Sequence, residues 1–460
     1  MNAHAFPAKP TAGIPAKSGA LTLMTLCTAM LIAQLDTSVV NLASRPIGHE
    51  FHAPVSALQW VIDGYNLTYA VLLLSGGLLA DLYGRRRIFM MGAAIFSVSS
   101  VVCALAPSIA ILIVGRVLTG TGSALMLPAS LAILRVAWPD PKARARVLGI
   151  FTGCNGLAFI IGPTLGGFLI AEVGWRSVFF IVVPFGLAAL AAAPFAVSES
   201  ADPHGRHFDV SAQVLGILAL GGIAMAAIES HDGPAALLAL AVAFIALVAF
   251  LKVEARRGSA ALVPLDMFRV GPFRGAIIAT AGMTFGMYGV LFLQLLTWQS
   301  TGRLDAVGAG LALLPMAVIF ALVSPFSGAL QTRLGTRFMT GGGVAIIGCG
   351  LLTVGASAGS ASLLSAEIGL MLAGLGMGLA TGPLTGVAVG AVPAARSGTA
   401  AALVNVARMV GATLGVAALG AVFALLQDGT EGLLISMLLG GSVQIVAAGF
   451  CWRAVPHDRI

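Results

Sequence analysis

Long apolar runs separated by short polar segments fill most of the chain, from residue 18 to residue 452. A lipid hydrocarbon core about 30 Å thick needs about 20 apolar residues per helical span. Runs interrupted by charge, proline and glycine predict fourteen such spans, near 19–43, 57–80, 88–106, 109–136, 143–171, 175–196, 210–229, 234–252, 273–298, 306–329, 338–357, 362–390, 398–426 and 432–452. The pattern therefore predicts an all-α membrane protein.

The spans group as six, two and six, and a repeat supports this grouping. The segment "GLLADLYGRR" from Gly77 has a counterpart, "GALQTRLGTR" from Gly328, after the second span of each six-helix set. Two related six-helix halves around a central cavity are typical of transporters that rock one half against the other. The expected units are a tail (1–18), a six-helix bundle (19–198), a central loop with two extra spans (199–254), a loop (255–272), a second six-helix bundle (273–454) and a tail (455–460). For the two extra spans, a lipid-facing hairpin is favoured over a part in the substrate site.

Charge sets the expected orientation. Only 9% of residues are charged, against about 25% in soluble domains. Outer loops hold three basic residues, Arg45, Arg176 and Arg303, whereas the other loop Lys and Arg residues fall on the opposite side. Lys and Arg favour the cytoplasmic side, so both termini are expected inside. The net charge of +7 is scattered over short loops, which argues against a nucleic-acid partner.

The N-terminal segment and the cysteines give two further expectations. The first residues are polar and Pro-rich, unlike a cleaved signal peptide. The five cysteines show no paired spacing that would indicate disulfides or a zinc site.

The loop between the second and third spans places an aspartate and three arginines between apolar runs. Arginine is common in cytoplasmic loops in general, and this would be enough to explain Arg86 and Arg87 if they stood alone. The ordered pattern resembles the signature loop of the major facilitator superfamily, with matches at Gly77, Leu79, Asp81, Gly84, Arg85 and Arg86. The resemblance implies a conformational latch at this loop, although Leu82 stands where arginine is frequent.

Other motifs resemble the fourteen-helix drug:proton antiporters of that superfamily. They are "LDTSVVNLASRPI" from Leu35, "RVLTGTGSALMLP" from Arg116 and "GLAFIIGPTLGG" from Gly156. The last contains the antiporter motif, carried by Gly162, Pro163, Gly166 and Gly167. Small residues at this spacing also serve ordinary helix packing in membranes, so the resemblance is what favours export.

Charged residues within the predicted spans are candidates for function because each costs several kcal/mol unless it meets a partner or water. They are Asp36, Asp63, Arg116, Glu367 and Arg408. Asp36, at the level of Arg116, is the favoured proton-coupling acid. The alternative for Asp36 is a structural hydrogen-bond acceptor. Asp63 is expected to attract cationic substrates, with a structural role as the alternative. Glu367 is expected at the cavity unless its span begins one turn later, which would place it in outer water. Arg408 is expected at the cavity, either to bind anionic groups or to serve packing.

Aromatic residues are weaker candidates. Tyr65, Phe285, Tyr288 and Phe292 could line the cavity and offer ring faces to cations, although packing is the commoner role of such residues.

The favoured function is a proton-driven antiporter that exports amphipathic small molecules across the inner membrane of a bacterium. The alternatives are an exporter dedicated to one metabolite or self-made toxin and, less favoured, a channel or membrane scaffold. No phosphate-binding G-x-x-x-x-G-K-[ST] or H-E-x-x-H motif occurs, so we expect no catalytic residues, metal or cofactor. The expected partners are a small-molecule substrate, protons and the lipid bilayer. Binding to periplasmic adaptor proteins is an open alternative, and without them the protein is expected to be a monomer.

Overall fold

The computed structural model describes residues 16–201, 209–229, 233–258, 261, 263–360, 362–393, 396–426 and 429–455. The predicted tails therefore lie largely outside the described residues, as does part of the central loop. Within the described ranges, fourteen helical segments are long and apolar enough to cross a membrane. The all-α membrane architecture predicted from the sequence is confirmed.

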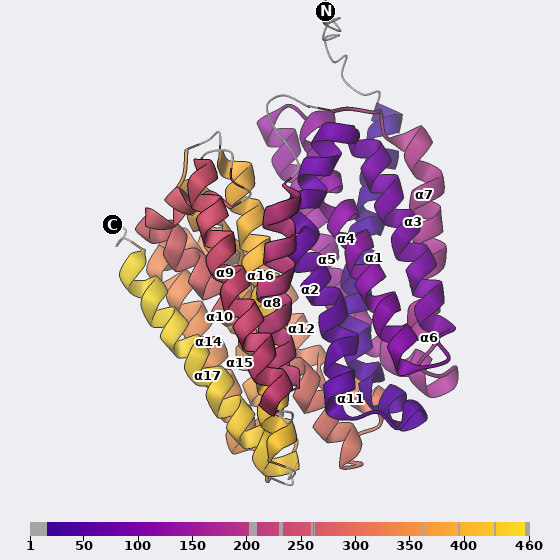
Figure 1. Ribbon diagram of the computed structural model, residues 1–460, viewed down its shortest axis with the longest axis vertical. Coiled ribbons are helices and arrows are strands. Elements are labelled where there is room, and N and C mark those ends of the chain that lie inside the picture. Colours follow the sequence, from indigo (N-terminus) through magenta and orange to yellow (C-terminus); the bar gives the residue numbers. More distant parts are fainter. Residues whose placement is uncertain are drawn as a thin grey trace, which may run out of the picture.

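The first six spans form one half of the molecule (Figure 1). They comprise α1 (Ala16–Phe51), α2 (Val55–Tyr83), α3 (Arg85–Ala104), α4 (Ile109–Ala137), α5 (Pro141–Glu172), and α6 (Ser177–Phe180) with α7 (Val182–Ala196). The central pair is α8 (Val210–Ile228) and α9 (Gly233–Arg257).

A short 3-10 helix, η2 (Leu265–Arg269), leads into the second half. Its spans comprise α10 (Gly271–Ser300), α11 (Ala306–Ala312) with α12 (Leu314–Val323), η3 (Ser324–Phe326) and α13 (Ser327–Leu334), η4 (Phe338–Gly342) with α14 (Gly343–Ala356), α15 (Leu364–Gly390), α16 (Ser397–Leu425) and α17 (Gly429–Ala454).

The first, sixth and tenth spans differ from their predicted form, and the sixth is divided at Ile181 into α6 and α7. The first was expected to end at residue 43, but α1 continues through Pro46 to Phe51. It ends where His52 takes a positive φ of 50° and Pro54 follows. The tenth span is broken near Leu313, because Pro315 in the first turn of α12 lacks the N–H that a continuous helix would use.

The internal repeat is visible in matching contacts. Gly84 and Gly335 end the second helix of each half with φ of 109° and 84°, a conformation that glycine adopts without strain. Two residues further on, Arg86 donates to the carbonyl of Val197 (3.2 Å) and Arg337 to that of Val455 (2.6 Å). In each half, the repeated loop is therefore tied to the end of the sixth span.

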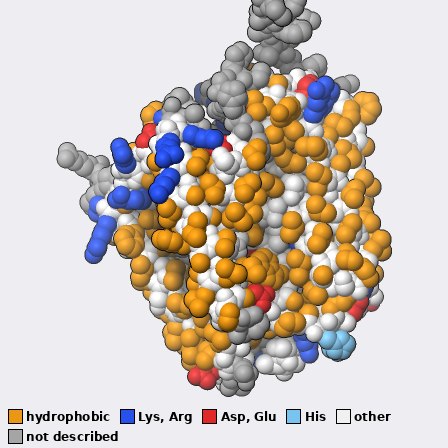
Figure 2. All heavy atoms as spheres, viewed as in Figure 1, with side chains coloured by type: hydrophobic (Ala, Val, Ile, Leu, Met, Phe, Trp, Pro, Cys, Tyr) orange, Lys and Arg blue, Asp and Glu red, His pale blue; other side chains and the backbone are white. Residues whose placement is uncertain are grey.

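We call the end with the α1–α2, α3–α4 and α10–α11 turns (residues 52–54, 105–108 and 301–305) the outer end, following the predicted orientation. The other is the inner end, where α1 begins and α17 ends (Figure 1). Figure 2 shows most of its visible Lys and Arg side chains at the inner end. This is the asymmetry from which the orientation is predicted.

The halves are joined closely toward the outer end. Gln299 of α10 donates to the carbonyl of Leu42 on α1 (3.1 Å). Gln59 of α2 donates to the carbonyls of Val416 and Ala417 on α16 (2.9 and 3.0 Å). These side-chain bonds cross the seam near the outer ends of the helices, so the outer side is closed in this state.

The central pair lies over the seam between the halves (Figure 1). Helix α8 packs against α2 and also against α16. Gln213 of α8 donates to the carbonyl of Val71 on α2 (2.7 Å) and also bonds Ser75. Toward α16, the contact is an apolar cluster that includes Ala224 and Ala417. Helix α9 covers α8 and presents mainly exposed apolar side chains, as expected for contact with lipid.

Candidate functional site

A buried ion pair lies inside the first half. Arg116 of α4 and Asp36 of α1 are each only 1% exposed. The guanidinium Nη1 donates to Asp36 Oδ2 at 2.6 Å, and Nε donates to the carbonyl of Val61 on α2 at 2.9 Å. One guanidinium thus binds two helices, and the structure brings together the two residues expected at the same level.

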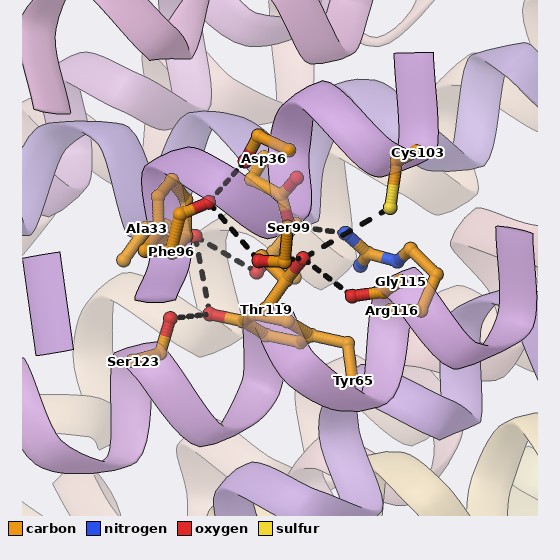
Figure 3. Close-up of polar contacts among 12 residues, drawn as sticks. Ala33, Asp36, Tyr65, Phe96, Ser99, Cys103, Gly115, Arg116, Thr119 and Ser123 are labelled. Atoms are coloured by element: carbon orange, nitrogen blue, oxygen red, sulfur yellow. Dashed lines mark hydrogen bonds and ion pairs between the residues drawn. The ribbon is translucent and has the colours of Figure 1, made fainter. Parts of the chain in front are cut away.

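Polar and aromatic side chains surround this pair (Figure 3). The Arg116 guanidinium carbon lies 4.8 Å from the ring centre of Tyr65, a distance at which a cation is attracted to the ring face. The Tyr65 hydroxyl donates to Ser123 Oγ at 3.0 Å, and that of Thr119 donates to Ser99 Oγ at 3.0 Å. Tyr65 therefore belongs to the surroundings of the ion pair and not to the cavity described below.

Asp63 on α2 is the second buried acid, and it is 0% exposed. Asn66, three residues further on, lies beside it, but neither carboxyl oxygen makes a well-formed hydrogen bond with any described residue. A carboxyl group buried in this way is costly as an anion and far less costly when it carries a proton. Asp63 does not line the cavity, where a substrate-attracting role would place it.

The central cavity lies between the halves and has a volume of ≈ 110 Å³, several times the space that one water molecule needs. Its walls are mostly apolar and contain five methionines: Met30, Met283, Met287, Met377 and Met409. Its polar lining includes Gln34 of α1, Tyr69 of α2, Tyr288 of α10, and Asn405 and Arg408 of α16. The predicted cavity residues Tyr288 and Arg408 are thus placed at this cavity.

Other predicted cavity residues lie elsewhere. Phe292 is completely buried in the packing of α10. Glu367 is half-buried in the first turn of α15, at the outer end. It lies there because α15 begins at Leu364, so that Glu367 is close to the helix end and not deep in the span.

Sequence reasoning missed several lining residues. Tyr69 lies one helical turn after Tyr65, and Asn405 lies three residues before Arg408, on the same face of α16. That spacing was the available signal. Gln34 and the methionines carried no comparable signal, because glutamine is uncharged and methionine is as apolar as the other residues of a membrane span.

The signature loop is tied to the first half. Arg85 binds Asp81 at 2.8 Å. Glu199, which follows α7, accepts from the backbone N–H groups of Arg86 and Arg87 (3.0 and 3.2 Å) and so caps α3. Sequence reasoning missed Glu199. These contacts join the loop to the sixth span, and the latch role stays a prediction.

The antiporter motif lies where α5 meets two helices. A Cβ on Gly166 would come within 2.5 Å of the Val39 side chain on α1, and one on Gly167 within 2.6 Å of the Ala306 carbonyl on α11. A Cβ on Gly310 of α11 would come within 2.2 Å of the Pro163 carbonyl. Glycines therefore allow the two halves to approach backbone to backbone at α5 and α11.

Comparisons with known proteins agree with this architecture. Residues 26–416 match the model of the Major Facilitator Superfamily, and the chain belongs to this family. It is a membrane transporter and not an enzyme. Among solved structures, a bacterial homolog of the human lysosomal transporter Spinster has a TM-score of 0.68 at 17% identity and covers 96% of this chain and 98% of its own. A D-xylose-proton symporter has a TM-score of 0.69 at 16% identity, covering 96% and 98%.

Curated relatives are more similar in sequence. Multidrug resistance protein Stp of Mycobacterium tuberculosis (strain CDC 1551 / Oshkosh) is 36% identical over 88% of this chain and 76% of its own. The methylenomycin A resistance protein of Streptomyces coelicolor is 30% identical over 94% and 92%. The tetracenomycin C resistance and export protein of Streptomyces glaucescens is 34% identical over 88% and 76%.

Proposed function

We propose that this protein exports drugs or other amphipathic small molecules across the bacterial inner membrane in exchange for protons. The names of its relatives, which refer to multidrug and antibiotic resistance, support the export of such compounds. The observation that carries the proton coupling is the buried pair of Asp36 and Arg116, together with the unpaired acid Asp63 buried in the same half. Because some relatives are named for one compound, export of a single metabolite is the second candidate.

In the proposed mechanism, a proton that binds Asp36 removes the negative charge that holds Arg116. The guanidinium then keeps its bond to the Val61 carbonyl on α2 but loses its counter-charge on α1, so the contact between α1 and α4 weakens. Asp63, two residues after Val61, is the second carboxyl group that can carry a proton. Exchange of the proton would thus change how three helices of the first half are held together, which alternating access requires.

Inside-out membrane vesicles test this proposal. An imposed pH gradient, acid inside, should drive uptake of a fluorescent dye by vesicles that contain the protein, and a protonophore should abolish it. Vesicles without the protein are the control for passive dye distribution. Uptake that requires ATP and continues with the protonophore present contradicts proton coupling.

A further inference from the structure

The central cavity contains an arginine without a carboxylate partner. Arg408 of α16 faces the cavity, and its Nε has no hydrogen-bond partner among the described residues. No described carboxylate lies within ion-pairing distance of it, and its electrostatic neighbours are the phenol groups of Tyr69 and Tyr288. Arg408 is half-buried, and a charged side chain inside a membrane protein normally has a partner. Because no described carboxylate fills that place, Arg408 has unused capacity to bind an anion.

The acids of the first half do not offset this charge at the cavity wall. Asp36 is already paired with Arg116, and Asp63 does not line the cavity. Arg408 is the one charged side chain among the described residues that line the cavity. A cation that enters would meet a like charge in a poorly screened interior, whereas an anion would meet its counter-charge.

The rest of the lining indicates what the anion is attached to. Methionine side chains are flexible and polarisable, and they adapt to apolar bodies of different shape. Phe159 of α5 and Phe320 of α12 pack with ring centres 5.7 Å apart, one from each half, at the same cavity. This wall suits a flat aromatic body.

We propose that the cavity selects amphipathic aromatic acids, with Arg408 binding the carboxylate, phenolate or sulfonate group and the methionine and phenylalanine side chains binding the aromatic body. This inference rests on the proposed function, because it names the substrate class of the same cavity. Tyr69 and Tyr288 bring hydroxyl groups that can also donate to the anion. Lipophilic cations, the class first expected from Asp63, are disfavoured at this cavity.

Three probes with one aromatic body test the proposal: 1-pyrenebutyrate, 1-pyrenebutanol and 1-pyrenebutylamine. Their binding to detergent-solubilised protein is measured by fluorescence, with no proton gradient present. We expect the carboxylate to bind about tenfold or more tighter than the alcohol, because hydrogen bonds to charged groups are the strong ones. The amine should bind most weakly.

Variants test whether Arg408 causes the preference for the carboxylate probe. Arg408→Gln should reduce the ratio of carboxylate to alcohol affinity to about one, whereas Arg408→Lys, which keeps a point charge, should retain part of the preference. The matched control is Arg453→Gln, which removes an exposed arginine at the end of α17 and should leave the ratio unchanged. A preference that persists in Arg408→Gln overturns the assignment.

The order of the three probe affinities in the unmodified protein tests the proposal even if Arg408→Gln does not fold. If the amine binds as tightly as the carboxylate, the proposal is wrong. A protein that prefers the carboxylate but shows no gradient-driven uptake supports the anion site and contradicts proton-coupled export, so the two proposals fail separately.

Discussion

Replacement of Asp36 by asparagine should destabilise the protein, and the structure gives the size of the effect. Both partners of the pair are 1% exposed and lie 2.6 Å apart. Asparagine keeps an oxygen that can accept from Arg116 but carries no negative charge, so the guanidinium stays buried and charged without its counter-charge. Breaking a buried pair in this way costs about 3–5 kcal/mol.

Asp63→Asn is the matched control, since it makes the same chemical change in a carboxyl group that is buried just as deeply. The carboxyl oxygens of Asp63 make no well-formed hydrogen bond, and the oxygen of the Asn66 side chain beside them has no well-formed hydrogen bond either. The new amide can donate to that oxygen. We therefore expect little change in stability.

Unfolding in detergent, followed by the midpoint of thermal denaturation, measures these differences. Asp36→Asn should melt well below the unmodified protein, and the double variant Asp36→Asn with Arg116→Gln should recover most of the loss. The double variant should still lack gradient-driven uptake, which separates coupling from folding. Equal midpoints for Asp36→Asn and Asp63→Asn, or no recovery in the double variant, would refute the reasoning.

Three further predictions concern packing. Gly84→Ala should lower the melting midpoint more than Gly174→Ala, because both positions have a positive φ but only at Gly84 would the new Cβ meet another group, the Glu199 carboxylate at 2.8 Å. Gly310→Ala should separate the halves at the outer end, because the new Cβ would lie 2.2 Å from the Pro163 carbonyl, and should increase chemical labelling of a cysteine introduced at the outer end. Gly386→Ala should not, because its new Cβ would have no other atom within 4 Å. Gln213→Leu removes the bonds from α8 to Val71 and Ser75 and should lower stability by about 1–3 kcal/mol, measured by denaturant unfolding; an unchanged midpoint would mean that α8 is held by apolar contacts alone.

The fold could be predicted because membrane spans leave a strong one-dimensional signal. Runs of about 20 apolar residues, with basic loops between them, fix the number and order of the spans without knowledge of any contact. Span ends were less certain, since helices continue into the interface. Helix α1 extends to Phe51 for this reason. Helix α15 instead begins at Leu364, two residues later than predicted, which leaves Glu367 in its first turn.

The site was harder to predict, because it depends on which face of each helix points inward. In a soluble helix, polar residues mark the exposed face. Here lipid and protein interior are both apolar, so Met287 in the cavity and Phe292 in the packing look alike in sequence. Charged residues were the exception, since their cost in the membrane singles them out. The shared level of Asp36 and Arg116 and a place for Arg408 at the cavity were expected from the sequence. That Arg116 pairs with Asp36 and leaves Asp63 without an ion-pair partner required the structure.

Helix α1 links the parts on which the proposed cycle depends. Gln34 of α1 lines the cavity, and Asp36, two residues further on, points instead to Arg116. Near the outer end, the carbonyl of Leu42 accepts from Gln299 of the other half. One helix thus contacts the cavity, the buried ion pair and the closed outer seam. Because side chains two residues apart in a helix do not share a face, a substrate at Gln34 and a proton at Asp36 can act on α1 from different sides. We therefore expect coupling to depend on the position of α1 and to need no direct contact between the substrate and the proton-binding acid.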